Sequence, residues 1–98
     1  MKLSLANTPN QKLPFLSGDY TYVLTLRIFE GVLYATVDID DETIIASRRV
    51  TAGEDIFFCD HLQKKYGNLT FYSKYDTAVT DYSTYNEAVY LEFIPPTE

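Results

Sequence analysis

A run of alternating apolar and polar residues over positions 20–39 constrains the fold more than any other part of the chain. Large apolar side chains recur at every second position on both sides of Glu30-Gly31, as half-buried β-strands require. A two-residue turn there makes the apolar faces of both strands coincide, whereas an odd loop would oppose apolar to polar residues. We therefore predict an antiparallel hairpin with an even loop and a positive φ at Gly31. The predicted pairs are Leu24 with Val37 and Leu26 with Ala35.

Shorter segments on both sides of this hairpin also predict strands. They lie around Leu3 and Leu5 and over residues 11–16, 43–51, 69–74 and 88–94. Pro14 cannot donate to a ladder, which places residues 11–16 at a sheet edge. Residues 88–94 are apolar on both faces, which favours a central or covered strand. In the segment 43–51 the expected core-facing residues are Ile44, Ala46 and Val50.

Two segments have less regular patterns. Residues 54–66 favour a strand end that leads into one or two helical turns, with Gly67 as a cap, although a short strand at 56–58 is the alternative. Residues 76–86 show no sustained period and predict a long surface loop. We therefore predict that residues 1–98 form one all-β domain. It would be a small antiparallel meander that forms a sandwich or partly open barrel, with at most one short helix.

Composition narrows the functional classes. A net charge of −6 and a pI near 4.6 argue against direct, sequence-specific nucleic-acid binding, because few cations are available to meet phosphates. Cys59 is the single cysteine, so no intramolecular disulfide is expected. The chain shows neither a signal peptide nor an apolar run long enough for membrane insertion, and we expect it to be made in a reducing cytoplasm.

Candidate catalytic and metal-binding groups are sparse. The acidic run Asp38, Asp40, Asp41 and Glu42 departs from the calcium-loop pattern and is expected to be a solvated turn. Cys59 and His61 lack the third partner that nucleophilic catalysis or a metal site would need. We read the sequon at Asn68 as chance, and we expect no cofactor.

Tyrosines are the stronger candidates for contact with a partner, because tyrosine is enriched at protein interfaces. Ordinary strand and loop packing explains them about equally well. The possible interface residues are Pro14, Tyr72, Tyr75, Tyr82 and Tyr85.

The order of strands and turns over nearly the whole chain resembles the phage tail baseplate plug family, whose members are small β-rich proteins. The matching residues are Leu3, Leu5, Pro9-Asn10-Gln11, Leu13-Pro14-Phe15, Gly18, Tyr22-Val23-Leu24-Thr25-Leu26, Tyr34, Asp38-Ile39, Ile45, Val50, Gly53, Asp55-Ile56, Gly67-Asn68-Leu69 and Val89-Tyr90-Leu91. The chain departs from the family at Tyr66-Gly67, where a glycine pair is common, and at Asn86-Glu87, where Leu-Gly is common.

The resemblance implies a virion structural protein of a contractile tail, assembled in the host cytoplasm. It would plug or line the hub channel above the spike, with hub, spike and tape-measure proteins as partners and several copies around the tail axis. It would not be an enzyme. The alternatives are a small ligand-binding barrel or enzyme subunit, and an adaptor of a related bacteriocin or secretion machine.

Overall fold

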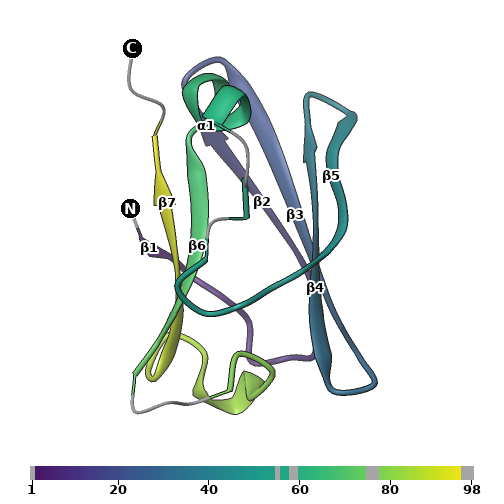
Figure 1. Ribbon diagram of the computed structural model, residues 1–98, viewed down its shortest axis with the longest axis vertical. Helices are drawn as coiled ribbons and strands as arrows, with labels where there is room; N and C mark the ends of the chain where they lie inside the picture. Colours follow the sequence, from purple (N-terminus) through teal and green to yellow (C-terminus); the bar gives the residue numbers. More distant parts are fainter. Residues whose placement is uncertain (1, 55, 58–59, 75–77, 96–98) are drawn as a thin grey trace.

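The computed structural model describes residues 2–54, 56–57, 60–74 and 78–95 and shows two antiparallel sheets packed face to face (Figure 1). One sheet has four strands in the order β2-β3-β4-β5, and the other has three in the order β1-β7-β6. The elements are β1 (Lys2–Leu3), β2 (Asn10–Ser17), β3 (Tyr20–Phe29), β4 (Val32–Ile39), β5 (Glu42–Arg49), α1 (Asp60–Tyr66), β6 (Asn68–Ser73), η1 (Tyr82–Thr84) and β7 (Val89–Ile94). The predicted all-β sandwich is confirmed, and its sheets are open.

The central hairpin has the predicted register. Leu24 pairs with Val37 and Leu26 with Ala35 across β3 and β4, and all four side chains are buried. In the turn, φ is 50° at Glu30 and 76° at Gly31. Two successive positive φ angles define the type I′ turn that matches the twist of a hairpin. The even loop and the position of Gly31 are therefore confirmed.

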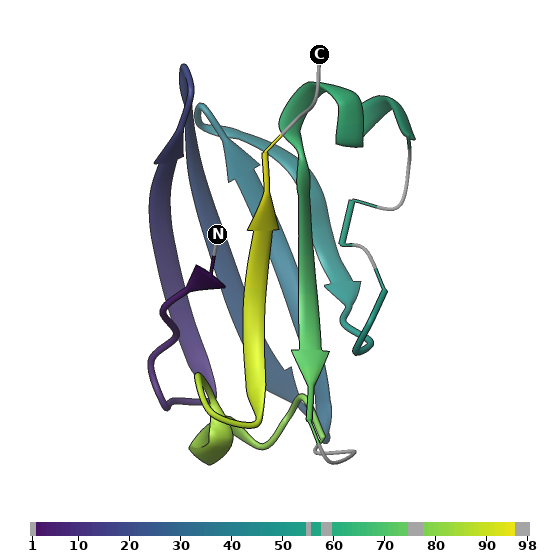
Figure 2. The same ribbon diagram turned by 90° about the vertical axis from the view of Figure 1, so that its left-hand side faces the viewer.

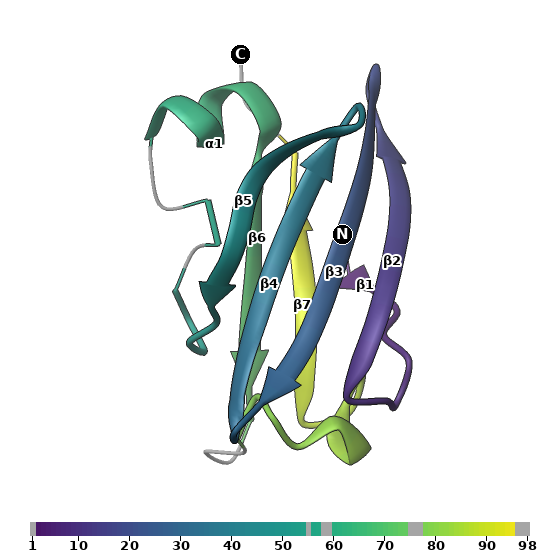
Figure 3. The same cartoon turned by 90° about the vertical axis from the view of Figure 1, so that its right-hand side faces the viewer.

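Strand β2 forms one edge of the four-stranded sheet, as Figure 3 shows from the side of that sheet. Its pairing with β3 is regular along the whole strand and sets Pro14 opposite Val23. The edge position predicted from Pro14 is confirmed. The predicted central position of residues 88–94 is confirmed as well, because β7 lies between β1 and β6.

The face predicted for residues 43–51 is wrong in part. Pairing between β4 and β5 shifts twice, so two residues of β5 are extra relative to β4. Ile45 is consequently the buried residue, whereas Ile44 is half-buried and Ala46 is exposed. One shift lies at Ser47, which has a φ of 45° and donates its N–H to Thr36 Oγ1 at 3.0 Å. Val50 is buried as predicted.

Aromatic rings connect the two sheets in the core. Phe15 stacks on Tyr22 with ring centroids 4.8 Å apart and meets Phe93 of the opposite sheet edge-on at 5.1 Å. Tyr22 is fully buried, and its hydroxyl donates to the Tyr66 carbonyl at 2.8 Å. This hydrogen bond satisfies the one polar atom that the ring brings into the core, and burial raises the pKa of Tyr22 to about 12.

After β5 the chain crosses to the outer edge of β6 (Figure 1). Gly53 donates its N–H to the Phe71 carbonyl at 2.7 Å, and Ile56 donates to the Leu69 carbonyl at 2.8 Å. These bonds cover the β6 edge, and Ile56 and Phe57 are buried beside it. Although the short strand weighed for 56–58 does not appear over its described part, the crossing segment shields this edge from solvent.

The helical turns predicted for residues 54–66 are confirmed by α1. Gly67 follows with a φ of 83° and donates its N–H to the Gln63 carbonyl at 2.9 Å. A left-handed glycine immediately after a helix is a common C-terminal cap, so the predicted cap is confirmed. Neither helix in the described chain has the length and apolarity to cross a membrane.

The segment between β1 and β2 is held mainly by amide side chains, because it leaves one sheet for the other. Asn86 accepts from the Leu5 N–H at 2.9 Å and donates to the Leu5 carbonyl at 2.7 Å. Gln11 does the same for Ala6, at 2.9 and 2.8 Å. We call Asn86 and Gln11, with Asn7, the amide clamp. Figure 2 shows this segment passing from β1 to β2.

Candidate interaction surfaces

The five residues proposed for partner contact lie in different surroundings. Pro14 is exposed on the β2 edge, Tyr72 is half-buried on β6, and Tyr82 is 40% exposed in η1. Tyr75 lies outside the described residues. The structure therefore does not gather the described members into one patch.

Tyr85 is a core residue, which contradicts its prediction as a possible interface residue. Only 2% of the residue is exposed, and its hydroxyl donates to the Val79 carbonyl at 2.8 Å. Burial, followed by the nearby Asp81 carboxylate, raises the pKa of this phenol to about 12. The loop thus uses Tyr85 to fasten itself to the sandwich, a role that its aperiodic sequence did not reveal.

Tyr82, by contrast, is available for contact. The 3₁₀ turn η1 presents it, and Asn7 of the amide clamp holds that turn by donating to the Tyr82 carbonyl at 2.9 Å. The predicted long surface loop therefore contains an ordered turn. A rigid backbone lowers the entropy lost when an exposed tyrosine is immobilised in an interface.

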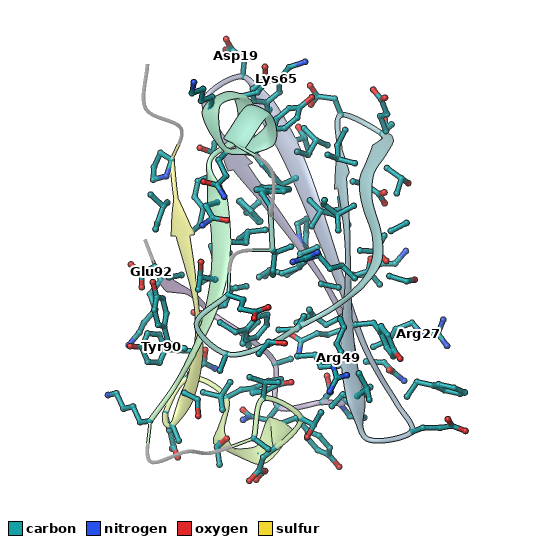
Figure 4. All side chains as sticks on the ribbon, in the orientation of Figure 1. Asp19, Arg27, Arg49, Lys65, Tyr90 and Glu92 are labelled. Carbon is teal, nitrogen blue, oxygen red and sulfur yellow. The ribbon has the colours of Figure 1, made fainter. Side chains whose placement is uncertain are left out.

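The outer face of the three-stranded sheet carries an aromatic pair, of which only Tyr72 was predicted as a possible interface residue. Tyr72 stacks on Tyr90 with ring centroids 5.4 Å apart. The ammonium groups of Lys2 and Lys74 lie 4.5 Å and 5.7 Å from the centre of the Tyr90 ring, close enough for cation–π attraction. Tyr90 and Glu92 lie on this outer side in Figure 4. Alternation within residues 88–94 was the signal that could have identified Tyr90.

The outer face of the four-stranded sheet carries a second candidate surface. Arg27 projects away from the sheet (Figure 4) and lines an open hollow of about 280 Å³ with Phe29, Tyr34 and Ser47. Phe29 is 57% exposed. Arginine and aromatic residues are enriched at interface hot spots. Arg27 and Phe29 alternate with the core residues of the hairpin, and this alternation is the sequence pattern that could have identified the surface.

A second hollow, also of about 280 Å³, opens near the start of β4. Its lining is Gly31, Val32, Leu33, Arg49, Val50, Thr51, Ala52, Ala78, Val79 and Thr80. Small and apolar residues dominate this lining, and Arg49 is the one ionisable group among its described residues. The described lining therefore offers no convergent acid, base or nucleophile of the kind that a catalytic site needs.

The acidic turn between β4 and β5 has a structural use. Asp38 accepts from the Thr43 hydroxyl at 2.6 Å, and Asp40 accepts from the Thr21 N–H at 2.9 Å. Both Asp40 and Asp41 have positive φ angles, 51° and 67°, which again define a type I′ turn. Among the described residues no cluster of three or more histidine, cysteine or acidic residues could hold a metal. Cys59 and the His61 side chain lie outside the described part.

Comparison with protein families identifies the family of this chain. The sequence model of the family described as cyanophage baseplate Pam3 plug gp18 matches residues 1–96. Among proteins with curated descriptions, none matches the chain.

Proposed function

The chain belongs to the phage baseplate plug family, and from this premise we propose that it plugs or lines the central hub channel above the spike of a contractile tail. Its function is then to make protein–protein contacts, and no enzymatic activity is expected. The observation that carries this proposal is the family match over residues 1–96. A phage baseplate is a structural assembly, which places the protein in the virion tail.

The surface residues of the domain support a role in protein–protein contact. Aromatic or cationic residues lie on the surface of both sheets and of the loop: Arg27, Phe29 and Tyr82 are exposed, and Tyr90 is half-buried. Arginine and aromatic residues are enriched at interface hot spots, which favours the plug over a ligand-binding barrel.

Its proposed neighbours are the hub, spike and tape-measure proteins, with several copies arranged around the tail axis. A stable interface buries roughly 800 Å² on each partner, and the whole chain exposes 5899 Å². The domain therefore has enough surface for more than one neighbour. A net charge of −6 is compatible with a channel that does not retain passing DNA.

Particles made with Tyr82→Ala test the contact role of the loop. Tyr82 is exposed, so the isolated variant should fold normally while less of it enters the baseplate, measured by quantitative mass spectrometry of purified particles. Glu87→Ala, in the same loop, is the matched control. Wild-type incorporation of Tyr82→Ala would remove this tyrosine from the interface.

Deletion of the gene tests the function itself. Particles that lack the protein should have an unblocked or incomplete hub and should lose infectivity. Normal assembly, DNA retention and injection without the protein would overturn the proposed role.

A further inference from the structure

The edges of the two sheets differ in how far they are covered. The β6 edge is bonded to Gly53 and Ile56, β5 is interrupted by two register shifts, and β1 has two residues. Strand β2 has eight residues and pairs regularly along its whole length. Among the described strands, β2 therefore has the longest regular open edge.

The backbone groups that point outward from β2 follow from its register. Ser17 and Tyr20 close the two-residue turn to β3, so they form a hydrogen-bonded pair, and bonding alternates from there. The backbone hydrogen-bonding groups of Lys12, Pro14 and Leu16 consequently point away from β3, toward the open edge. Lys12 and Leu16 present both an N–H and a carbonyl, whereas Pro14 presents only a carbonyl. Asn10 also faces outward, but its carbonyl already accepts from the Thr8 hydroxyl at 3.2 Å.

Apolar side chains flank the same open stretch. Leu16 is 74% exposed, the most exposed large hydrophobic residue described. On the other face, Leu13 and Phe15 pack against the core but are only partly buried. A hollow of about 440 Å³ adjoins the N-terminal half of the strand and is lined by Asn10, Gln11, Lys12, Thr25, Leu26 and Arg27. An additional strand beside β2 would bond the free backbone groups and cover these side chains.

We propose that residues 12–16 of β2 bind an extended segment of a neighbouring tail protein, which adds a fifth strand to the four-stranded sheet. On one face the segment would place apolar residues beside Leu13 and Phe15. On the other face it would place an apolar residue beside Leu16 and a carboxylate beside Lys12. Because Pro14 lacks a donor, the segment forms all but one of the possible hydrogen bonds. This inference rests on the proposed function for the identity of the neighbour.

A second copy of the chain fits this edge less well. Pairing two β2 strands would bring two proline-blocked positions into one ladder, whereas a foreign strand meets one. It would also add a second Lys12 to the same short ladder. Proline and lysine on an open strand are typical of edges protected against self-association. Pro14 therefore favours a foreign strand over a copy of β2.

Residue-resolved hydrogen exchange tests this proposal without any substitution. Isotopically labelled protein is compared as the isolated domain and after incorporation into particles. The amides of Lys12 and Leu16 should exchange freely in the isolated domain and at least tenfold more slowly in particles. Those of Leu13 and Phe15, which bond to β3, are internal controls and should be protected in both states.

The outcomes separate this inference from the proposed function. Protein present in particles with unprotected Lys12 and Leu16 amides would overturn the strand addition and leave the plug role intact. Absence of the protein from particles would overturn both. Concentration-dependent protection of these two amides in the isolated domain would identify a second copy as the occupant and overturn the foreign partner.

A pair of variants at one position gives an independent measurement. Leu16→Pro removes an outward N–H and one side-chain carbon, whereas Leu16→Ala keeps the N–H and removes three side-chain carbons. A larger loss with proline therefore cannot come from lost apolar contact. We expect incorporation of Leu16→Pro to be about fivefold lower than that of Leu16→Ala, the effect of one lost hydrogen bond. Pro14→Ala adds a donor and should raise incorporation. Equal incorporation of all three variants would refute the proposal.

Discussion

Replacement of Asn86 by alanine should destabilise the domain more than any other single change in an exposed loop. Asn86 combines two features that alanine lacks. As a member of the amide clamp, its side-chain amide makes two hydrogen bonds to the Leu5 backbone, 2.9 and 2.7 Å long. Its backbone also has a φ of 71°, in the left-handed region that asparagine tolerates better than alanine does.

The expected loss follows from these two contributions. Each hydrogen bond contributes about 1 kcal/mol, and alanine in the left-handed conformation costs about 1 kcal/mol more. Asn86→Ala should therefore lower the free energy of unfolding by about 3 kcal/mol, a large part of the 5–15 kcal/mol typical of a native domain. Asn86→Gly loses the hydrogen bonds, but glycine adopts the left-handed conformation without strain, so the free energy of unfolding should fall by about 2 kcal/mol.

Urea unfolding followed by circular dichroism measures both values, and Glu87→Ala is the matched control. Hydrogen exchange at the Leu5 amide provides a local readout, because this amide should lose protection in both Asn86 variants. A change below about 0.5 kcal/mol in Asn86→Ala, within the range of ordinary surface substitutions, would refute the reasoning. Equal losses in the alanine and glycine variants would refute the backbone contribution alone.

Three further predictions concern the core and the turns. Leu26→Asp should lower the free energy of unfolding by several kcal/mol because it buries an unpaired carboxylate, whereas Arg27→Asp on the exposed face should not; equal melting temperatures would contradict the register. Asp41→Gly should stabilise the domain by about 1 kcal/mol in urea unfolding because glycine adopts a positive φ without strain, and a loss of stability would show that the Asp41 side chain has a bonding role. Because burial raises the pKa of Tyr22 and Tyr85 to about 12, the folded state holds these protons more tightly than the unfolded state. The resulting stability should be complete below pH about 10 and decline from about 10 to about 12, and a flat urea-unfolding profile over that interval would contradict this.

The central hairpin could be predicted from sequence because the alternation of apolar and polar residues and the length of the turn both require the same register. An even loop at Glu30-Gly31 is the one that makes both apolar faces coincide, so register and turn type follow together. The edge position of Pro14 was predictable for a similarly local reason, the missing N–H. These features depend on residues close together in the chain.

Features that depend on distant contacts were not predictable from the same patterns. The register shift at Ser47 carries no glycine to mark it. Simple alternation therefore placed Ala46 on the core face and missed Ile45, although Ile44 does pack against the core. Tyr85 is buried because it packs in the core that strands of both sheets form. Asn86 meets Leu5 across 81 positions of sequence.

The pairing of β1 with β7 has a consequence for synthesis on the ribosome. Strands β2 to β5 are joined by two-residue turns within residues 10–49, so this sheet can form as soon as that stretch has emerged. Leu3, however, pairs with Leu91, and β6 also bonds to β7. The inner face of the four-stranded sheet therefore stays without its cover until residues 89–94 are translated. Nascent chains stalled before residue 89 should consequently bind hydrophobic dyes and recruit chaperones, whereas the released chain of 98 residues should not.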